Sequence, residues 1–340
     1  MRISSNDPIF RQNNTTERYI LQLNVMSKAI LFLISSVFLL GCDSKNRTHT
    51  IENQRTSPNV LIILADQWRA QATGYAGDPN VQTPNLDRLA AGSVNFTNAV
   101  SSMPVCTPFR ASLLTGQRPL TNGVFMNDVQ LDTNAVSLGK VFSKAGYDTG
   151  YIGKWHLDGH GRLQFIPPGK RRQGFQFWEA NECTHDYNES VYYENDDPTR
   201  KIWDGYDAFA ETDAAINYMD KRKEDKNPFL LVLSWGTPHA PYHTAPEEYR
   251  KRFDPDKIEL RDNVPEDMRE QVKKDLAGYY AHIAALDDMI GKLMDNLKET
   301  GELENTIVLF TSDHGDLLGS QGAYKKQQPY DEERWVSNQN

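Results

Sequence analysis

Side chains that can carry charge or bind a metal follow four strand-like runs of the sequence, each close to where the run ends. They are Asp66, Gln67, Lys154, His156, His239, Asp313 and His314. Asp66, Gln67, Asp313 and His314 among them supply mostly oxygen ligands and lack the sulfur expected of structural zinc, so they suit a hard divalent cation. Arg110, Lys154 and the Lys325-Lys326 pair add cations that could hold a tetrahedral oxyanion. The residue types therefore predict a site that combines a divalent cation with the binding of an anionic group.

The elements that must position these side chains alternate between strands and helices. Strands are expected over residues 59–65, 94–100, 147–153, 229–234 and 306–311, and helices over 84–91, 138–145 and most of 267–298. This alternation predicts an α/β fold with a doubly wound, mainly parallel sheet sandwiched by helices. Ligands of such sheets bind outside the carboxyl ends of the strands, so we expect the strand ends to meet. Residues 160–205 and 240–266 lack periodicity and are expected to form long loops over the site.

Composition narrows the class of protein. The chain has 340 residues, with 46 acidic against 37 basic side chains and a net charge of −9, and it contains no run rich in Lys or Arg. A nucleic-acid partner is therefore not expected. With 39% apolar and 24% charged residues the chain has ordinary globular composition, and its three cysteines are too few for a disulfide scaffold.

The N-terminal region has the pattern of an export signal. In residues 26–41, Lys28 precedes an apolar run of about 12 residues, too short to cross a hydrocarbon core of roughly 30 Å as a helix. The sequence Leu39-Leu40-Gly41-Cys42 resembles a bacterial lipobox, which implies that Cys42 is the lipidated first residue of an exported, membrane-anchored lipoprotein, periplasmic or at the cell surface. Residues 1–25 are interpreted as a start-site error and 42–57 as a linker. The alternative is a buried N-terminal helix with an incidental cysteine.

Cys106 begins a stretch that matches a known family signature. The chain reads Cys106-Thr107-Pro108-Phe109-Arg110 and continues to Leu114-Thr115-Gly116-Gln117-Arg118. This closely resembles the C-x-P-x-R and L-T-G-x-R signature of the sulfatases. A second family signature is similar to the stretch from Gly146 to His156. The resemblance covers residues 58–333 as a catalytic domain. It implies a fold of the alkaline phosphatase superfamily.

The resemblance implies two cofactors. Cys106 would be converted to formylglycine by a maturation enzyme, and the modified residue would join Asp66, Gln67, Asp313 and His314 as a metal ligand. Ca²⁺ is the family's usual ion. Gln67 stands where many members have a second Asp, and His314 where some have Asn, so the anionic charge is lower and Mg²⁺ is the alternative.

The resemblance also assigns roles to the remaining site residues. Arg110 and Lys154 match residues that stabilise the formylglycine hydrate and the sulfate. His156 matches the group that assists collapse of the covalent intermediate. His239 and Lys326 match the pair around the ester oxygen and the sulfate, with His239 protonating the leaving alcohol. Two alternatives stay open: Lys325 in place of Lys326, and His239 as a core histidine.

Together these features predict a sulfuric ester hydrolase that acts on sulfated carbohydrates. One alternative is a phosphonate or phosphodiester hydrolase of the same superfamily. Sulfatases usually continue into a core strand and a C-terminal subdomain, whereas residues 334–340 here lose the family pattern. We therefore expect that subdomain to be missing, with an exposed sheet flank and a loss of stability. The third alternative is accordingly an inactive remnant that at most binds sulfated glycan.

Overall fold

The computed structural model describes residues 57–339 except 224, 226 and 337. The described residues belong to one compact unit, residues 55–340, and the description below concerns that unit. The predicted start-site error, the signal peptide and Cys42 lie outside the described residues, as does all of the predicted linker except Ser57. No helix in the described part of the chain combines the length and the apolar character needed to span a bilayer.

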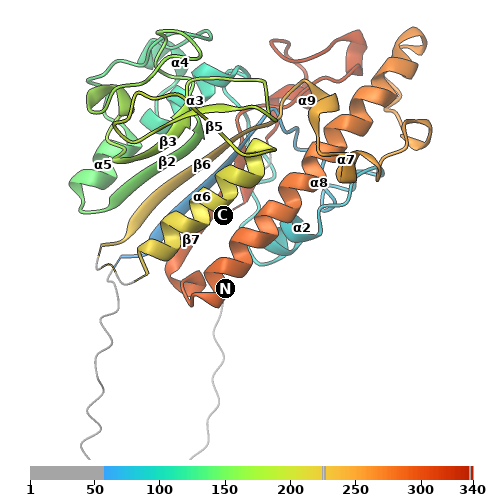
Figure 1. Ribbon diagram of the computed structural model, residues 1–340. Coiled ribbons are helices and arrows are strands. Elements are labelled where there is room, and N and C mark those ends of the chain that lie inside the picture. The colour runs from blue at the N-terminus through green and yellow to red at the C-terminus, as the bar shows by residue number, and fades with distance from the viewer. Residues whose placement is uncertain (1–56, 224, 226, 337, 340) are drawn as a thin grey trace, which may run out of the picture. The chain divides into compact units, whose positions relative to one another are not determined.

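A mixed sheet forms the centre of the fold, as Figure 1 shows. Among the described residues it has eight strands in the order β5-β4-β3-β2-β6-β1-β7-β8. Their bounds are β1 Asn59–Asp66, β2 Asp148–Lys154, β3 Phe177–Asn181, β4 Val191–Glu194, β5 Lys201–Ile202, β6 Phe229–Pro238, β7 Thr306–Ser312 and β8 Asn338–Gln339. Strands β3, β2, β6, β1 and β7 are parallel, and β4, β5 and β8 add antiparallel edges. The predicted, mainly parallel sheet is confirmed.

Helices cover both faces of the sheet because the central strands are apolar on both sides. Leu61 and Ile63 of β1 pack in one buried cluster, whereas Ile62 between them packs in another. The helices are α2 Pro84–Ala91, α3 Cys106–Thr115, α4 Pro119–Asn122, α5 Leu138–Lys144, α6 Asp207–Lys221, α7 Glu247–Arg250, α8 Arg269–Glu299 and α9 Asp331–Arg334. Figure 1 shows α6 and α8 on one face, and the second cluster includes Ala111 and Leu114 of α3 on the other. The doubly wound arrangement is therefore confirmed.

Some expected elements are wrong. Residues 94–100 form no strand of the described sheet: Val94, Phe96 and Val100 are exposed, and Val100 makes only an isolated bridge with Trp335. The span 160–205 is not all loop, because it contains β3, β4 and β5, and the span 240–266 contains α7. Helices α3 and α6 were not predicted. Part of the tail pairs with the domain, since β8 lies beside β7 on the flank that we expected to be exposed.

Gly153 in β2 allows β2 and β6 to approach closely. Its φ is +92°, and a Cβ atom there would lie 2.2 Å from the Ser234 carbonyl oxygen. We expect Gly153→Ala to lower the free energy of unfolding by roughly 2 to 4 kcal/mol, because it adds backbone strain to a clash with β6. Urea unfolding measures the change. Gly92→Ala is the matched control, since its φ is negative and its nearest contact would be 3.8 Å away. Equal effects of the two substitutions would contradict this account.

Candidate active site

The carboxyl ends of the parallel strands bring the predicted residues to one edge of the sheet. Asp66 ends β1, Lys154 ends β2, and Asp313 follows β7 directly. Cys106 is the first residue of α3, and its side chain is almost fully buried at 2% exposed. The prediction that separate strand ends meet at one place is therefore confirmed.

A buried cluster at this edge has the composition of a metal site. One ligand atom each from Asp66, Cys106, Asp313 and His314 lies within 4.8 Å of the others. His314 Nδ1 lies 2.8 Å from the Gly315 carbonyl oxygen, so the ring can donate there and leave the Nε2 lone pair toward Cys106 Sγ, 3.3 Å away. Asp313 Oδ2 is buried and accepts no hydrogen bond from the described residues, although Arg110 Nε lies 3.6 Å away. A buried carboxylate oxygen without a hydrogen bond, among such neighbours, fits a divalent cation.

Gln67 faces the same cluster through its amide oxygen. Its Nε2 donates to the Asp316 carboxylate, and its Oε1 accepts from Lys326 Nζ at 2.9 Å. The amide is therefore oriented with its oxygen toward the cluster, as a metal ligand requires. Its backbone φ of +67° marks the sharp turn at the end of β1.

The two aspartates have different electrostatic surroundings. Burial alone would raise the pKa of Asp66, but Lys154, Arg110 and Lys326 together hold it well below its usual range. Burial raises the pKa of Asp313, and the Asp66 carboxylate adds to that effect, bringing it to about 6. A cation between the two carboxylates would stabilise both as anions.

Three cations surround Asp66 and Cys106. Arg110 Nη2 lies 2.9 Å from Asp66 Oδ2, and Lys154 Nζ lies 2.7 Å from the same atom. Lys326 Nζ is 2.9 Å from Cys106 Sγ, whereas the Lys325 side chain is exposed at the surface. The structure thus selects Lys326 over Lys325. These three positively charged side chains can bind the oxygens of an anionic substrate.

The position of Cys106 favours ionisation of its thiol. Burial and Asp66 oppose the thiolate, yet Lys154 and Lys326 hold the pKa of Cys106 well below its usual range. Cys106 also begins α3, where the helix N-terminus favours negative charge.

His156 is held by a residue that sequence reasoning missed. Its Nε2 lies 3.2 Å from Asp128 Oδ1, and Arg162 grips the same carboxylate through Nε at 3.1 Å and Nη2 at 2.8 Å. His156 Nδ1 is buried and has no hydrogen bond from the described residues. Asp128 lies in a segment without a motif, so no sequence signal pointed to it. Within the described residues, the hydrogen bond and ion pair of His156 go to Asp128 and not to the four-residue cluster.

His239 is paired with another histidine that the sequence did not single out. The rings of His239 and His185 stack in parallel, with centroids 4.4 Å apart. Burial, and then the charge of Lys326, lowers the pKa of His239 well below its usual range. These surroundings disfavour the protonated ring, which the predicted role needs. The charge of an anionic ester beside it would favour that form.

Comparisons with known proteins agree with this geometry. The profile of the sulfatase family matches residues 58–336. The "Ulvan-active sulfatase" of Formosa agariphila is 45% identical over 325 residues, which cover 95% of this chain and 63% of the relative. The chain thus spans a little under two thirds of that relative's length. The solved structure of yidJ from Bacteroides fragilis superposes with a TM-score of 0.78 at 32% identity, covering 83% of this chain and 67% of the other.

A phosphonate monoester hydrolase of Agrobacterium radiobacter superposes with a TM-score of 0.64 at 23% identity, covering 83% of this chain and 67% of that one. This likeness concerns the fold alone. The family profile spans the whole predicted catalytic domain, residues 58–333, and Cys106 of the signature belongs to the buried cluster. The chain belongs to the sulfatase family.

Proposed function

We propose that this protein hydrolyses sulfate monoesters of sulfated carbohydrates. The observation that carries the proposal is the position of Cys106, which lies beside Asp66 and His314. The Nζ atoms of Lys154 and Lys326 also lie next to its Sγ atom. The family membership supports the reaction class. The carbohydrate class is supported by relatives named as an ulvan-active sulfatase and an endo-4-O-sulfatase.

Two groups would complete the site. Cys106 would be oxidised to formylglycine by a maturation enzyme. The ligands of a divalent cation, Ca²⁺ or else Mg²⁺, would be Asp66, Gln67, Asp313, His314 and the modified Cys106. The hydrated aldehyde would supply the attacking oxygen, and the cation would lower the pKa of that oxygen and polarise the sulfate.

The side chains of this protein would neutralise the substrate and move protons. A sulfate monoester repels nucleophiles because its peripheral oxygens share negative charge, so Arg110, Lys154 and Lys326 would bind those oxygens. His239 would protonate the ester oxygen as the alcohol leaves. His156 would accept a proton at Nδ1, the nitrogen opposite to Asp128, when sulfate is released.

A matched pair of substrates tests the reaction class. We expect the matured protein to hydrolyse para-nitrophenyl sulfate with a higher kcat/KM than the phosphodiester with the same leaving phenol. The leaving group is held constant, so the comparison reports the recognition of the transferred group alone. Preference for the phosphodiester would favour the phosphonate or phosphodiester hydrolase. No hydrolysis of either substrate by protein that contains formylglycine would favour the inactive remnant.

Asp128 should position His156 without touching the substrate. We expect Asp128→Asn to lower kcat by roughly 10- to 100-fold with a small change in KM, because the neutral amide no longer fixes the ring or its tautomer. The pH dependence of kcat should shift as well, which a merely structural loss would not produce. Asp204→Asn is the control, since Asp204 is exposed and lies outside the site. An unchanged kcat and pH profile in Asp128→Asn would contradict the role.

We also propose export and anchoring through lipid on Cys42, which lies outside the described residues. Its support is the lipobox-like sequence Leu39-Leu40-Gly41-Cys42. Incorporation of labelled palmitate into the parent protein, and its loss in Cys42→Ala, would support the anchor. Equal labelling of both proteins would contradict it.

A further inference from the structure

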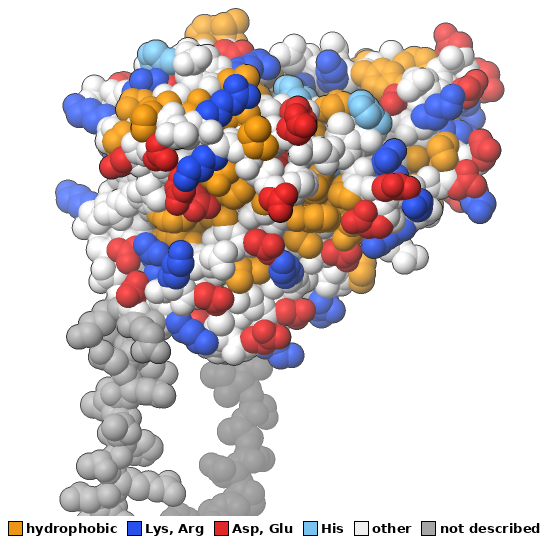
Figure 2. Space-filling view, in the orientation of Figure 1, with side chains coloured by type: hydrophobic (Ala, Val, Ile, Leu, Met, Phe, Trp, Pro, Cys, Tyr) orange, Lys and Arg blue, Asp and Glu red, His pale blue; other side chains and the backbone are white. Residues whose placement is uncertain are grey.

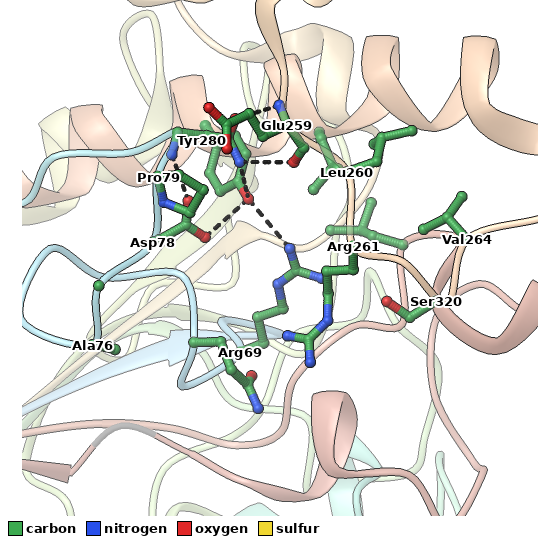
Figure 3. A pocket seen from close by; sticks show the side chains of 15 residues that line it. Arg69, Ala76, Asp78, Pro79, Glu259, Leu260, Arg261, Val264, Tyr280 and Ser320 are labelled. Atoms are coloured by element: carbon green, nitrogen blue, oxygen red, sulfur yellow. Dashed lines mark hydrogen bonds between the residues drawn. The ribbon is translucent and has the colours of Figure 1, made fainter.

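A cavity whose lining includes none of Asp66, Cys106, Asp313 and His314 is lined by two arginines, Arg69 and Arg261. It has a volume of about 320 Å³ and lies between the loop around Asp78, the segment that contains Arg261, and α8. Figure 3 shows Arg69, Arg261 and Ser320 around it, with Tyr280 of α8 on another side. None of these residues has a role in the reaction proposed above.

The cavity lies next to the cluster in the fold. Arg69 follows the ligand Gln67 by two residues. The Tyr279 hydroxyl links their backbones, because it accepts from Arg69 N at 2.9 Å and donates to the Gln67 carbonyl oxygen at 2.7 Å. A molecule that occupies the cavity would therefore lie close to the end of β1, where Asp66 begins the site.

Buried polar groups of the cavity lack partners. Arg69 is only 3% exposed, and within the described residues its guanidinium makes one hydrogen bond, from Nη2 to the Tyr280 hydroxyl at 3.2 Å. No carboxylate of the described chain forms an ion pair with it, and its Nε has no hydrogen-bond acceptor there. Ser320 is fully buried, and its hydroxyl also lacks a partner among the described residues. Burying a guanidinium and a hydroxyl in this state is costly unless an acceptor enters the cavity.

Arg261 adds a second positive charge to the same cavity. Glu332 lies 3.6 Å from its Nε, and its terminal nitrogens make no ion pair within the described chain. Glu259 and Asp78 also line the cavity, but the oxygens of Asp78 already accept hydrogen bonds from Asn80 N and the Tyr280 hydroxyl. Gln71 Oε1 also lines the cavity and is an acceptor without a partner among the described residues. The unpartnered donors there are the charged Arg69 Nε and the Ser320 hydroxyl, so the cavity favours an acceptor that carries negative charge.

We propose that this cavity binds an oxyanionic group, held by Arg69 and Arg261 with the Ser320 hydroxyl as a further donor. Guanidinium groups recognise sulfate and carboxylate through paired hydrogen bonds. The volume lies near the lower end of the range for small-molecule sites, roughly 300 to 1,000 Å³, which suits one anionic sugar unit. The source of the oxyanion, a second charged group on the sulfated saccharide, rests on the proposed function. Free inorganic sulfate offers the same chemistry.

Anomalous diffraction from selenate tests the site directly. Crystals of the full chain would be soaked in sodium selenate for the parent, Arg261→Gln and Arg250→Gln. Arg261 is preferred to Arg69 because it is partly exposed, so its replacement should leave folding intact. Arg250 is exposed and does not line the cavity, so it is a matched control for the loss of one positive charge. We expect a selenium peak beside Arg69 and Arg261 in the parent and in Arg250→Gln, and its loss in Arg261→Gln.

Calorimetry with two probes distinguishes the sources. Sodium glucuronate carries a carboxylate on a sugar, whereas sodium sulfate is the free ion. If the occupant is a saccharide group, Arg261→Gln should weaken glucuronate binding by at least about tenfold, with Arg250→Gln unchanged. An effect on sulfate alone would overturn the saccharide source and leave a site for the free ion.

The selenium map also separates this inference from the proposed function. A peak at the Cys106 cluster without one in the cavity would overturn the cavity site and leave the proposed function standing. A cavity peak that persists in Arg261→Gln would overturn the assignment of Arg261. The reverse result, a cavity peak in a protein without sulfatase activity, would support the site and contradict the proposed function.

Discussion

Cys106→Ala is expected to abolish hydrolysis of sulfate esters, with a loss of kcat on the order of a thousandfold or more. Alanine cannot be converted to the aldehyde, so neither the attacking oxygen nor the metal ligand at position 106 would form. The neighbouring cations Lys154 and Lys326 would remain, so substrate binding should weaken less than turnover. The measurement is the initial rate on para-nitrophenyl sulfate, with peptide mass spectrometry to establish formylglycine in the parent.

Cys183→Ala is the matched control for this experiment. Cys183 is the other free cysteine among the described residues and is equally buried at 2% exposed. Its sulfur lies 3.8 Å from His185 Nε2. The sequence around Cys183 does not match the sulfatase signature. We expect this variant to keep formylglycine at position 106 and most of the activity. Full activity in Cys106→Ala, or a parent that is active with an unmodified thiol, would refute the role of Cys106.

Asp313→Ala should have the second largest effect, because it removes a proposed metal ligand that directly follows β7. We expect the affinity for Ca²⁺ to fall by roughly 100-fold or more and the activity to be lost with it. Asp313→Asn removes the negative charge of the side chain but keeps its size and one oxygen, so it tests the charge of the carboxylate separately from the shape of the side chain. Calorimetric titration with Ca²⁺ and, separately, Mg²⁺ measures both variants.

The control for Asp313 is Asp288→Asn, which removes one carboxylate from the half-exposed face of α8. Its ion pair with Arg252 is long at 3.7 Å, so little change is expected. If Asp313→Ala bound the cation as tightly as the parent, the metal site would have to lie elsewhere. Restoration of its activity by excess Ca²⁺ would instead show that the ligand contributes affinity alone.

The sheet and the cluster could be predicted because their causes are local. An unbroken apolar run such as residues 59–65 must be covered on both sides, and the polar residue that follows it then lies at the carboxyl edge. The same rule was misleading for residues 94–100. Their alternating apolar residues have the composition of a strand, but no neighbouring strand pairs with them over that length. Strand formation depends on a partner that the segment itself does not specify.

The parts that could not be predicted depend on how distant segments fold together. Asp128 contacts His156 because two loops meet, and neither loop has a periodic pattern. The choice of Lys326 over Lys325 depends on a backbone turn: Lys325 has a φ of +64° and Gln327 one of +80°. These conformations direct the second lysine toward Cys106 and leave the first in solvent. Such torsions follow from packing against Asp316, whose carboxylate accepts from Lys325 N.

The central place of β1 has a consequence for how the chain is made. This strand pairs with β6 on one side and β7 on the other, and Gln67 at its end bonds to Asp313, 246 residues later. Translation at about 5 to 20 residues per second would leave one edge of β1 without its neighbour for roughly 10 to 50 s. A long apolar strand with an open edge is prone to pair with other chains in that interval. The yield of native protein should therefore depend on chaperones that shield nascent β1 until β7 leaves the ribosome.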